Sequence, residues 1–244
     1  MHLCIDIGNS QVKTAVYSGT RIIGKSCWDA IGRPELKDIK KDYPNIKNVI
    51  LCSVRNDNPD LITSLRENFP FLLVMDHETA IPVKNLYKSK TTLGNDRLAA
   101  ITGANNNYPG RAVLVVDVGT AITYDIINES GHYLGGNISP GIAMRFRSLH
   151  EFTERLPLVG PRDDVPLLAN NTEESIISGV MNGILFEMQL FIDRIEEKFR
   201  DLVIVFTGGD AKYFDKKLKN TIFVDPDLIF TGLNRILTYN VRQK

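Results

Sequence analysis

Apolar residues recur along the chain in short runs, and the pattern of these runs repeats. One run ends in Asp6-Ile7-Gly8, and another ends 111 positions later in Asp117-Val118-Gly119. Each is followed by a run in which apolar and polar residues alternate, at 12–17 and at 122–127, and then by a turn and a third run. Such runs are typical of strands. Both halves of the chain are therefore predicted to begin with a three-stranded meander.

Beyond each meander, the spacing of apolar residues indicates helices that alternate with short strands. The expected strands are residues 49–53, 71–75, 202–207 and 221–224. The expected helices are residues 34–43, 59–69, 96–107, 172–199, 211–219 and 227–239. This alternation predicts an α/β fold in which a mixed sheet carries helices on its faces. Because Tyr108-Pro109-Gly110 interrupts the pattern just before the second meander, we expect two lobes, at 1–108 and 109–244.

Two similar lobes in tandem resemble the actin-like (ribonuclease H-like) superfamily of ATPases and kinases. The resemblance implies that each lobe is a mixed sheet with helices on its faces and that ATP binds in the cleft between the lobes. It is a likeness of fold, and it leaves the second substrate open.

Composition and charge narrow the classes of function. The chain is 43% hydrophobic, and its 29 Lys and Arg residues balance 29 Asp and Glu residues. A protein that coats nucleic acid would carry a basic excess, and a membrane span would need about 20 consecutive apolar residues. Cys4, Cys27 and Cys52 lack the spacing of a zinc or redox site, and we expect them to be reduced core residues. We therefore expect a cytoplasmic protein that binds neither nucleic acid nor a membrane.

The first Asp-x-Gly turn has the residue types of a phosphate site. Gly8 lets backbone N–H groups approach a ligand, Asn9 and Ser10 add side-chain donors, and Lys13 adds a positive charge. Asp6 can hold Mg²⁺ directly or through water. A plain hairpin uses the same residue types, but it does not explain an Asp at the buried end of a strand in both copies.

The second turn repeats the carboxylate and the glycine with hydroxyls in place of the lysine. Here Asp117 and Gly119 are followed by Thr120, and Tyr124 stands where the first copy has its lysine. Near the end of the fourth strand of each half lie Ser53-Val54-Arg55 and Thr207-Gly208-Gly209-Asp210. The latter resembles the adenosine-binding turn of actin-like kinases, and a simple strand-to-helix turn is the alternative.

A third motif, Gly94-Asn95-Asp96-Arg97, precedes an apolar helical run. An Asn or Asp at this point could simply cap the helix. However, the tetrad resembles the Gly-x-Asp-Arg motif of type III pantothenate kinases. Further matches to that family are Tyr87, seven residues before the motif, and the segments 6–13, 117–123, 135–141 and 171–176. One departure is Lys90, where the family usually has proline.

The resemblance implies an enzyme that transfers the γ-phosphoryl group of ATP to the primary hydroxyl of pantothenate, the first step of coenzyme A biosynthesis. It implies that Asp96 is the general base, that Gly119 and Thr120 contact ATP, and that Asp117 binds a monovalent cation, K⁺ or NH₄⁺. The implied contacts of pantothenate are Tyr87, Gly94, Asn95, Asp96, Arg97 and Thr172.

Other interpretations remain open at the level of sequence. Asn171 and Glu174 have the spacing of a capping box, so Thr172 could simply begin a helix. A kinase of another small alcohol or acid, or a non-catalytic regulator, could share the fold. The family resemblance also implies a homodimer with the acceptor pocket at the subunit interface.

Overall fold

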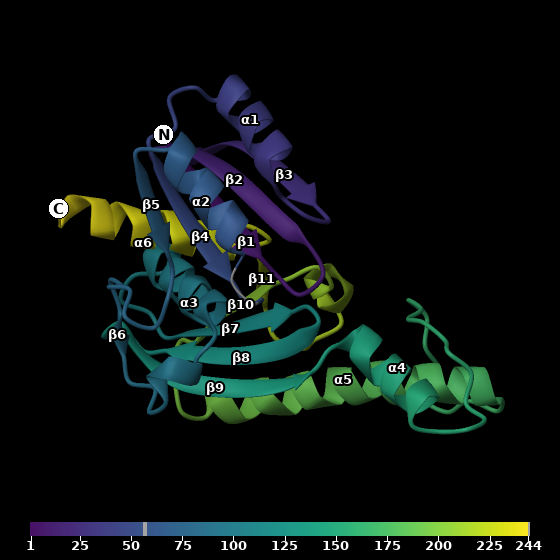
Figure 1. The fold of residues 1–244 in the computed structure, drawn as a ribbon. Coiled ribbons are helices and arrows are strands. Elements are labelled where there is room, and N and C mark those ends of the chain that lie inside the picture. Colours follow the sequence, from purple (N-terminus) through teal and green to yellow (C-terminus); the bar gives the residue numbers. More distant parts are fainter. Residues whose placement is uncertain (56–57, 244) are drawn as a thin grey trace. The chain divides into compact units, whose positions relative to one another are not determined.

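The computed structural model describes residues 1–55 and 58–243 and divides into two compact units (Figure 1). Unit 1 consists of Met1–Pro109, Gly131–Tyr133 and Asp227–Lys244. Unit 2 consists of Gly110–Ser130 and Leu134–Pro226. The last helix of the chain, which we expected among the elements of the second half, thus belongs to unit 1.

The sheet of unit 1 begins with the predicted meander. Its strands are β1 (His2–Ile7), β2 (Val12–Ser18), β3 (Arg21–Trp28), β4 (Asn48–Ser53) and β5 (Phe71–Val74). Their order is β3-β2-β1-β4-β5, with antiparallel pairs within the meander and parallel pairs from β1 to β4 and from β4 to β5. The predicted mixed sheet is confirmed, and the carboxyl ends of β1, β4 and β5 lie at one edge.

Helices cover both faces of this sheet. On one face, α1 (Arg33–Asp42) and α2 (Pro59–Asn68) bury their apolar sides against the strands, for example Leu36 and Leu65. The other pair is α3 (Asn95–Asn107) and α6 (Leu228–Arg242), which pack against each other, and α6 also contacts β1 and β4.

The α3–α6 contact is close because each helix presents a glycine at the crossing. A Cβ built on Gly232 would overlap with the carbonyl of Ala99, and one built on Gly103 would overlap with the carbonyl of Leu228. The two backbones can therefore approach only where side chains are missing, which fixes how far α3 lies from α6.

The sheet of unit 2 repeats that of unit 1. Its strands are β7 (Val113–Val118), β8 (Ala121–Ile127), β9 (His132–Pro140), β10 (Val203–Thr207) and β11 (Phe223–Val224). They follow one another as β9-β8-β7-β10-β11, the same order as in the first copy. The first two residues of β9, His132 and Tyr133, belong to unit 1 and pair there with β6 (Lys84–Asn85). The internal repeat is confirmed at the level of topology.

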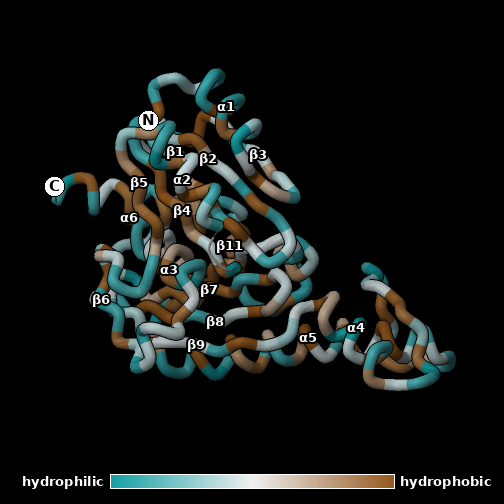
Figure 2. Tube along the Cα trace, viewed as in Figure 1, coloured by the Kyte–Doolittle hydropathy of each residue, from teal (hydrophilic) through white to brown (hydrophobic). Residues whose placement is uncertain are grey.

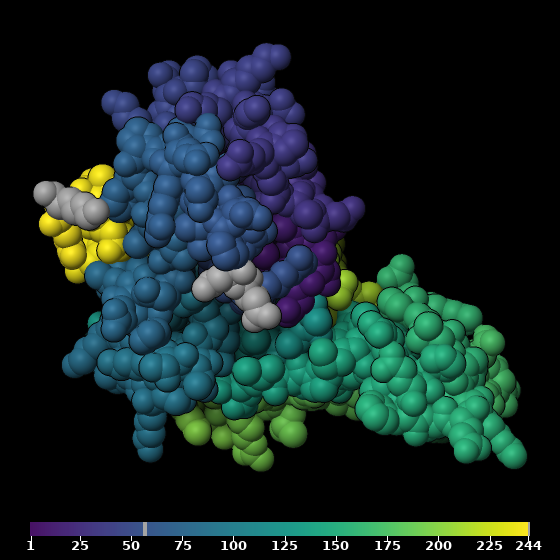
Figure 3. All heavy atoms as spheres, in the orientation of Figure 1, coloured from purple at the N-terminus to yellow at the C-terminus, as the bar shows by residue number. Residues whose placement is uncertain are grey.

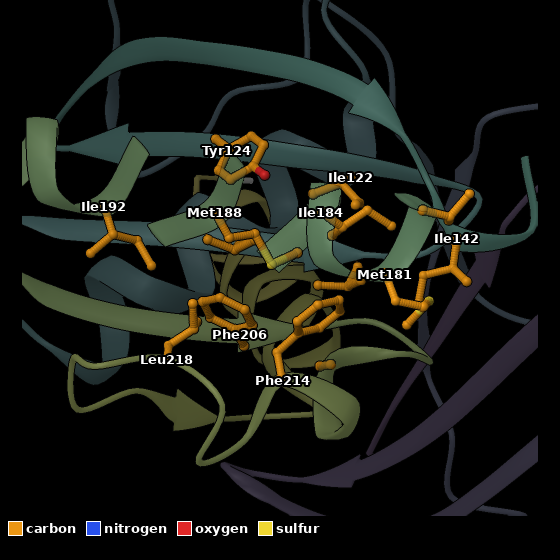
Figure 4. Packing of buried hydrophobic residues seen from close by; sticks show 14 of the residues in the cluster. Ile122, Tyr124, Ile142, Met181, Ile184, Met188, Ile192, Phe206, Phe214 and Leu218 are labelled. Carbon is orange, nitrogen blue, oxygen red and sulfur yellow. The ribbon is translucent and has the colours of Figure 1, made fainter. Parts of the chain in front are cut away.

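A long helix contributes a large part of the core of unit 2. Met181, Ile184 and Met188 of α5 (Thr172–Glu196) lie among Ile122 of β8 and Phe206 of β10 (Figure 4). α4 (Ile142–Glu151) packs beside α5. By length and composition α5 could cross a membrane, but apolar and polar residues alternate along it (Figure 2), and its buried side fills this core.

Three expectations need correction. Residues 211–219 form only the 3₁₀ turn η2 (Ala211–Phe214), and Lys216 takes a φ of 64°, which a helix cannot contain. α4 was not predicted. Cys4 and Cys52 are buried as expected, but Cys27 is exposed, because it lies on β3 at the edge of its sheet.

Candidate active site

The first Asp-x-Gly turn joins β1 to β2 in unit 1. Asp6 pairs with Lys13 on β2 and with Cys52 on β4, and the backbone N–H of Gly8 donates to the carbonyl of Gln11 at 3.0 Å. A Cβ built on Gly8 would lie 3.4 Å from that oxygen, an ordinary contact distance. Backbone geometry therefore does not demand glycine here, and its missing side chain leaves room beside the turn.

The environment of the Asp6 carboxyl disfavours its charged form. Burial, followed by the charge of Asp96, raises its pKa from 3.8 to about 6, while the charge of Lys13 acts in the opposite direction. Burial, followed by the charges of Asp6 and Asp96, also raises the pKa of the Cys52 thiol. The structure thus brings together the predicted magnesium ligand and the predicted base, which are far apart in the sequence.

Asp96 lies in the first turn of α3, one residue after the helix begins. Gly94 is the N-cap residue, and Asp96 Oδ1 accepts the backbone N–H of Arg97 at 2.8 Å. A Cβ built on Gly94 would overlap with this carboxylate oxygen, so a side chain there would displace the Asp96 carboxylate. Asp96 is therefore not the N-cap residue, although its carboxylate accepts one of the N–H groups at the start of the helix.

Asn95, the remaining member of the motif, has a structural contact. Its Nδ2 donates to the carbonyl of Met75 at 2.9 Å, which ties the start of α3 to the end of β5. Asn95 also lines a cavity of about 240 Å³ at the carboxyl edge of the sheet, together with Ile7, Ser53 and Leu61. The cavity adjoins the motif on the side of the sheet that α2 covers.

Two predicted substrate residues meet beside α3. The guanidinium carbon of Arg97 lies 5.7 Å from the centre of the Tyr87 ring, and this ring stacks at 6.0 Å on Tyr133. The Arg97 residue is only 6% exposed. A buried guanidinium is held in one place by such a ring and is suited to a carboxylate ligand.

In unit 2, two glycines that follow other strands, Gly141 after β9 and Gly208 after β10, lie against the second turn. The backbone N–H of Gly119 donates to the carbonyl of Ala121 at 3.0 Å, and that of Gly141 donates to the carbonyl of Thr120 at 3.1 Å. A Cβ on Gly141 would overlap with the carbonyls of Gly119 and Thr120, and one on Gly208 would overlap with a carboxylate oxygen of Asp117. Gly208 also has a φ of 92°.

These contacts give a structural role to two motifs that the sequence analysis had identified only by their resemblance to other proteins. The matched segment 135–141 ends against the Thr120 turn, and the Gly208-Gly209 turn lies against Asp117. The role of Gly141 was not predicted. The sequence held no signal for it beyond the match, because the contact depends on how β9 ends.

The residue opposite Asp117 differs from our expectation. Equal spacing in the two turns predicted Tyr124 at the position that corresponds to Lys13. Asp117 pairs with Thr123 instead, because the second turn is one residue shorter than the first. Tyr124 points into the core and donates its hydroxyl to Glu187 at 2.9 Å. The position that corresponds to Lys13 therefore holds an uncharged threonine.

Thr172 is the first residue of α5. Asn171 is the N-cap, and its Oδ1 accepts the backbone N–H of Glu174 at 3.0 Å. The cap therefore belongs to Asn171, and the side chain of Thr172 is exposed at the end of the helix.

The donor groups fit ATP-bound magnesium better than a protein-only metal centre. Within residues 1–55 and 58–243, no three His, Cys, Asp or Glu side chains gather in a way that could hold a metal. Mg²⁺ in kinases is usually held by one or two carboxylates together with substrate phosphates and water. Asp6, a carboxylate whose charge is disfavoured by burial and by Asp96, suits that role.

Comparison with known proteins identifies the relatives of this chain. A family model described as type III pantothenate kinase matches residues 2–194. Proteins named type III pantothenate kinase are 44% identical in Christiangramia forsetii, over 100% of both chains, and 42% identical in Phocaeicola vulgatus, over 98% of this chain and 99% of the relative. The relatives thus match along their full length.

Solved structures agree on the fold. A protein from Campylobacter jejuni described as a Baf family transcriptional activator is 26% identical, with a TM-score of 0.63 over 98% of this chain and 99% of that one. Glucokinase from an Antarctic psychrotroph is 11% identical, with a TM-score of 0.56 over 98% of both chains, and shows likeness of fold alone. The expected actin-like fold is confirmed.

The raised pKa of Asp6 predicts a stability that depends on pH. The folded protein binds this proton more tightly than the unfolded chain, so the contribution of Asp6 to stability is complete below pH 3.8 and is lost as the pH rises through about 6. Asp6→Asn removes the titration. We expect its advantage over the parent in free energy of unfolding to grow by roughly 2–3 kcal/mol between pH 4 and pH 7.5.

Urea unfolding at several pH values measures this difference. Asp38→Asn, which removes an exposed acid on α1, corrects for the general loss of one negative charge. A difference between Asp6→Asn and the parent that stays constant with pH would contradict the prediction.

Proposed function

The chain belongs to the type III pantothenate kinase family, and we infer from this membership that it is an ATP-dependent kinase acting on the primary hydroxyl of pantothenate. The observation that carries this inference within the structure is the cluster of Asp6, Asp96, Arg97 and Tyr87 in unit 1. It combines a phosphate turn, a carboxylate for the acceptor's proton and a buried cation. We also propose that the enzyme acts in the cytoplasm as a homodimer.

We propose the following roles for the residues that approach the acceptor. The acceptor oxygen attacks the γ-phosphorus of ATP, ADP leaves, and the hydroxyl proton passes to Asp96. Asp96 is suited to this role because the amino end of a helix favours a carboxylate. Arg97, fixed against Tyr87, anchors the carboxylate of pantothenate. The missing side chain of Gly94 leaves room for the Asp96 carboxylate, and the hydrogen bond of Asn95 to Met75 holds the motif to the end of β5.

The phosphate side is proposed to use the two turns. Gly8, Asn9, Ser10 and Lys13 bind phosphate oxygens through backbone N–H groups, side-chain donors and charge. Asp6 holds Mg²⁺, which neutralises charge on the transferring group when it is bound with ATP. We propose that Gly119 and Thr120 contact ATP as well.

Replacing Asp96 tests both the activity and the base. In a coupled ADP-release assay, we expect the parent to turn over with pantothenate and not with acetate or sugars. Asp96→Asn keeps the size of the side chain but cannot accept a proton at neutral pH, so kcat should fall by about 10² to 10⁴. Because phosphoryl transfer depends strongly on positioning and charge, a loss near the lower end also fits.

A matched control exists on α2. Asp60 occupies the same second position of its helix as Asp96 does on α3, so Asp60→Asn should leave kcat unchanged. An Asp96→Asn variant that folds, binds both substrates and keeps most of its turnover would remove Asp96 from the mechanism. Turnover with a sugar and none with pantothenate would reject the proposed substrate.

We further propose that Asp117 binds K⁺ or NH₄⁺. The support is that Thr123, opposite Asp117, carries no charge, whereas Lys13 is opposite Asp6. Activity should therefore be higher in KCl or NH₄Cl than in NaCl at equal ionic strength. Asp117→Asn should lose this difference. Equal rates of the parent in Na⁺ and K⁺ would reject the proposal.

The homodimer is supported by one side of α5. Gly179, Gly183, Phe186 and Leu190 follow helical spacing, and Phe186 is 56% exposed. Apart from the backbone of the helix itself, a Cβ on either glycine would meet no described atom within 4 Å. Apolar side chains in the segment 152–168, which follows α4 at the surface (green, Figure 3), are also exposed. Apolar surface gathered in this way is typical of an interface between chains.

A charge on this side of α5 should prevent dimer formation. We expect the parent to sediment as a dimer and Phe186→Glu to sediment as a monomer, with loss of turnover if the acceptor site is completed by the second copy. Phe223→Glu, at an exposed phenylalanine of β11, is the control and should remain dimeric. A parent that is monomeric and fully active would overturn the proposal.

A further inference from the structure

An arginine outside the matched family motifs reaches the first phosphate turn. Arg55 stands just after β4, and its Nη2 donates to the backbone carbonyl of Asn9 at 2.8 Å. The start of this link is well fixed. The backbone N–H of Val54 donates to the carbonyl of Ile7 at 3.0 Å, and Ser53 Oγ accepts the backbone N–H of Arg55 at 3.1 Å. The end of β4 is thus tied to the end of β1 and, through Arg55, to the turn.

This bond decides how one peptide group of the turn is oriented. In a trans peptide the C=O and the following N–H point in opposite directions. Holding the carbonyl of Asn9 toward Arg55 therefore directs the backbone N–H of Ser10 away from Arg55. Without that bond the exposed peptide could rotate, and a carbonyl oxygen turned toward a phosphate would repel it. A phosphate turn works through its N–H groups, so the orientation matters for binding.

The charge of Arg55 acts in the same direction. Asp6 and Asp96 place two carboxyl groups near the end of β1, where each disfavours a further negative charge. Lys13 opposes them from β2. Arg55 is exposed, and a guanidinium has five N–H donors, of which the bond to Asn9 uses one. It can hold the turn and still face an approaching polyphosphate.

We propose that Arg55 is a positioning residue of the ATP site, which holds the Gly8–Gln11 turn in the conformation that binds the ATP phosphates. This rests on the proposed function, since it assumes that the turn binds ATP. An ordinary surface arginine that bonds a carbonyl would contribute little to stability, and its loss would not weaken the binding of one substrate more than another. A positioning residue and an ordinary surface arginine therefore differ in whether its replacement weakens the binding of phosphate-bearing ligands alone.

Direct binding separates them. Arg55→Met removes both the bond and the charge but keeps the length of the side chain. The dissociation constants of MgATP and MgADP should rise about tenfold, the size expected for a charge-assisted hydrogen bond at an exposed site. The KM for pantothenate should stay within about twofold. Adenosine, which has no phosphate, should bind to Arg55→Met and to the parent equally well.

Two further variants complete the test. Arg55→Lys keeps a charged donor that can reach the same carbonyl and should recover most of the affinity for MgATP. Arg66→Gln removes an exposed arginine of α2, away from the turn, and should bind like the parent. Thermal unfolding of each variant reports on folding, and Arg55→Lys keeps the proposal testable if Arg55→Met folds poorly, because it should then match the parent.

The outcomes are distinct. Unchanged binding of MgATP by Arg55→Met would overturn the proposal, as would an equal loss for adenosine or for pantothenate, or an Arg55→Lys variant as weak as Arg55→Met. If the parent binds MgATP but does not phosphorylate pantothenate, the proposed function fails while the binding measurements still decide the role of Arg55.

Discussion

Much of unit 1 is arranged around one unfavourable placement, a carboxylate at the buried end of β1. Burial and the nearby Asp96 raise the pKa of Asp6 to about 6, so its charged form at neutral pH is held against desolvation and repulsion. Such a placement persists in a folded protein because the rest of the structure determines it. The strands on both sides of β1 are paired along its whole length, which fixes the position of Asp6 at the end of the strand.

The second carboxylate is held there by a different contact. Asp96 begins α3, and the depth of α3 is set by the crossing with α6, where Gly103 and Gly232 let the two backbones meet. The position of Asp96 is therefore determined by α6, which lies far from it in the sequence. Gly94 then allows the Asp96 carboxylate to fold back over the start of its own helix. Close backbone packing at two places therefore produces the repulsion that Asp6 experiences.

The sequence predicted the repeated part of this arrangement and missed the parts that depend on contacts between elements. The two Asp-x-Gly turns could be found because they recur within the same strand pattern. The positions of Gly141 and Gly208 against the second turn could not, because they depend on how β9 and β10 end beside β7. α4 had apolar residues at helical spacing, including Ile142, Phe146 and Leu149, and a systematic count could have found it.

Two predictions were wrong because they used spacing along the chain, whereas the pairing of strands determines which residues face one another and which face solvent. Equal spacing was assumed in both turns, but the shorter second turn places Thr123 opposite Asp117. Cys27 was predicted to lie in the core because its neighbours in the sequence are apolar. It lies on β3, an edge strand with no neighbouring strand on one side, and its side chain is exposed to solvent. Both depend on partners across the sheet, which spacing within one strand does not specify.

The glycines of the motifs belong to two physical classes that look the same in the sequence. At Gly94, Gly141 and Gly208 an added Cβ would overlap with the turn or carboxylate that each one touches, so these glycines shape the site from within the protein. At Gly8 and Gly119 an added Cβ would have ordinary contact distances. Folding alone therefore does not require glycine there, and what the missing side chain leaves is space on the outer side of each turn. Backbone N–H groups beside such space are what a phosphate needs.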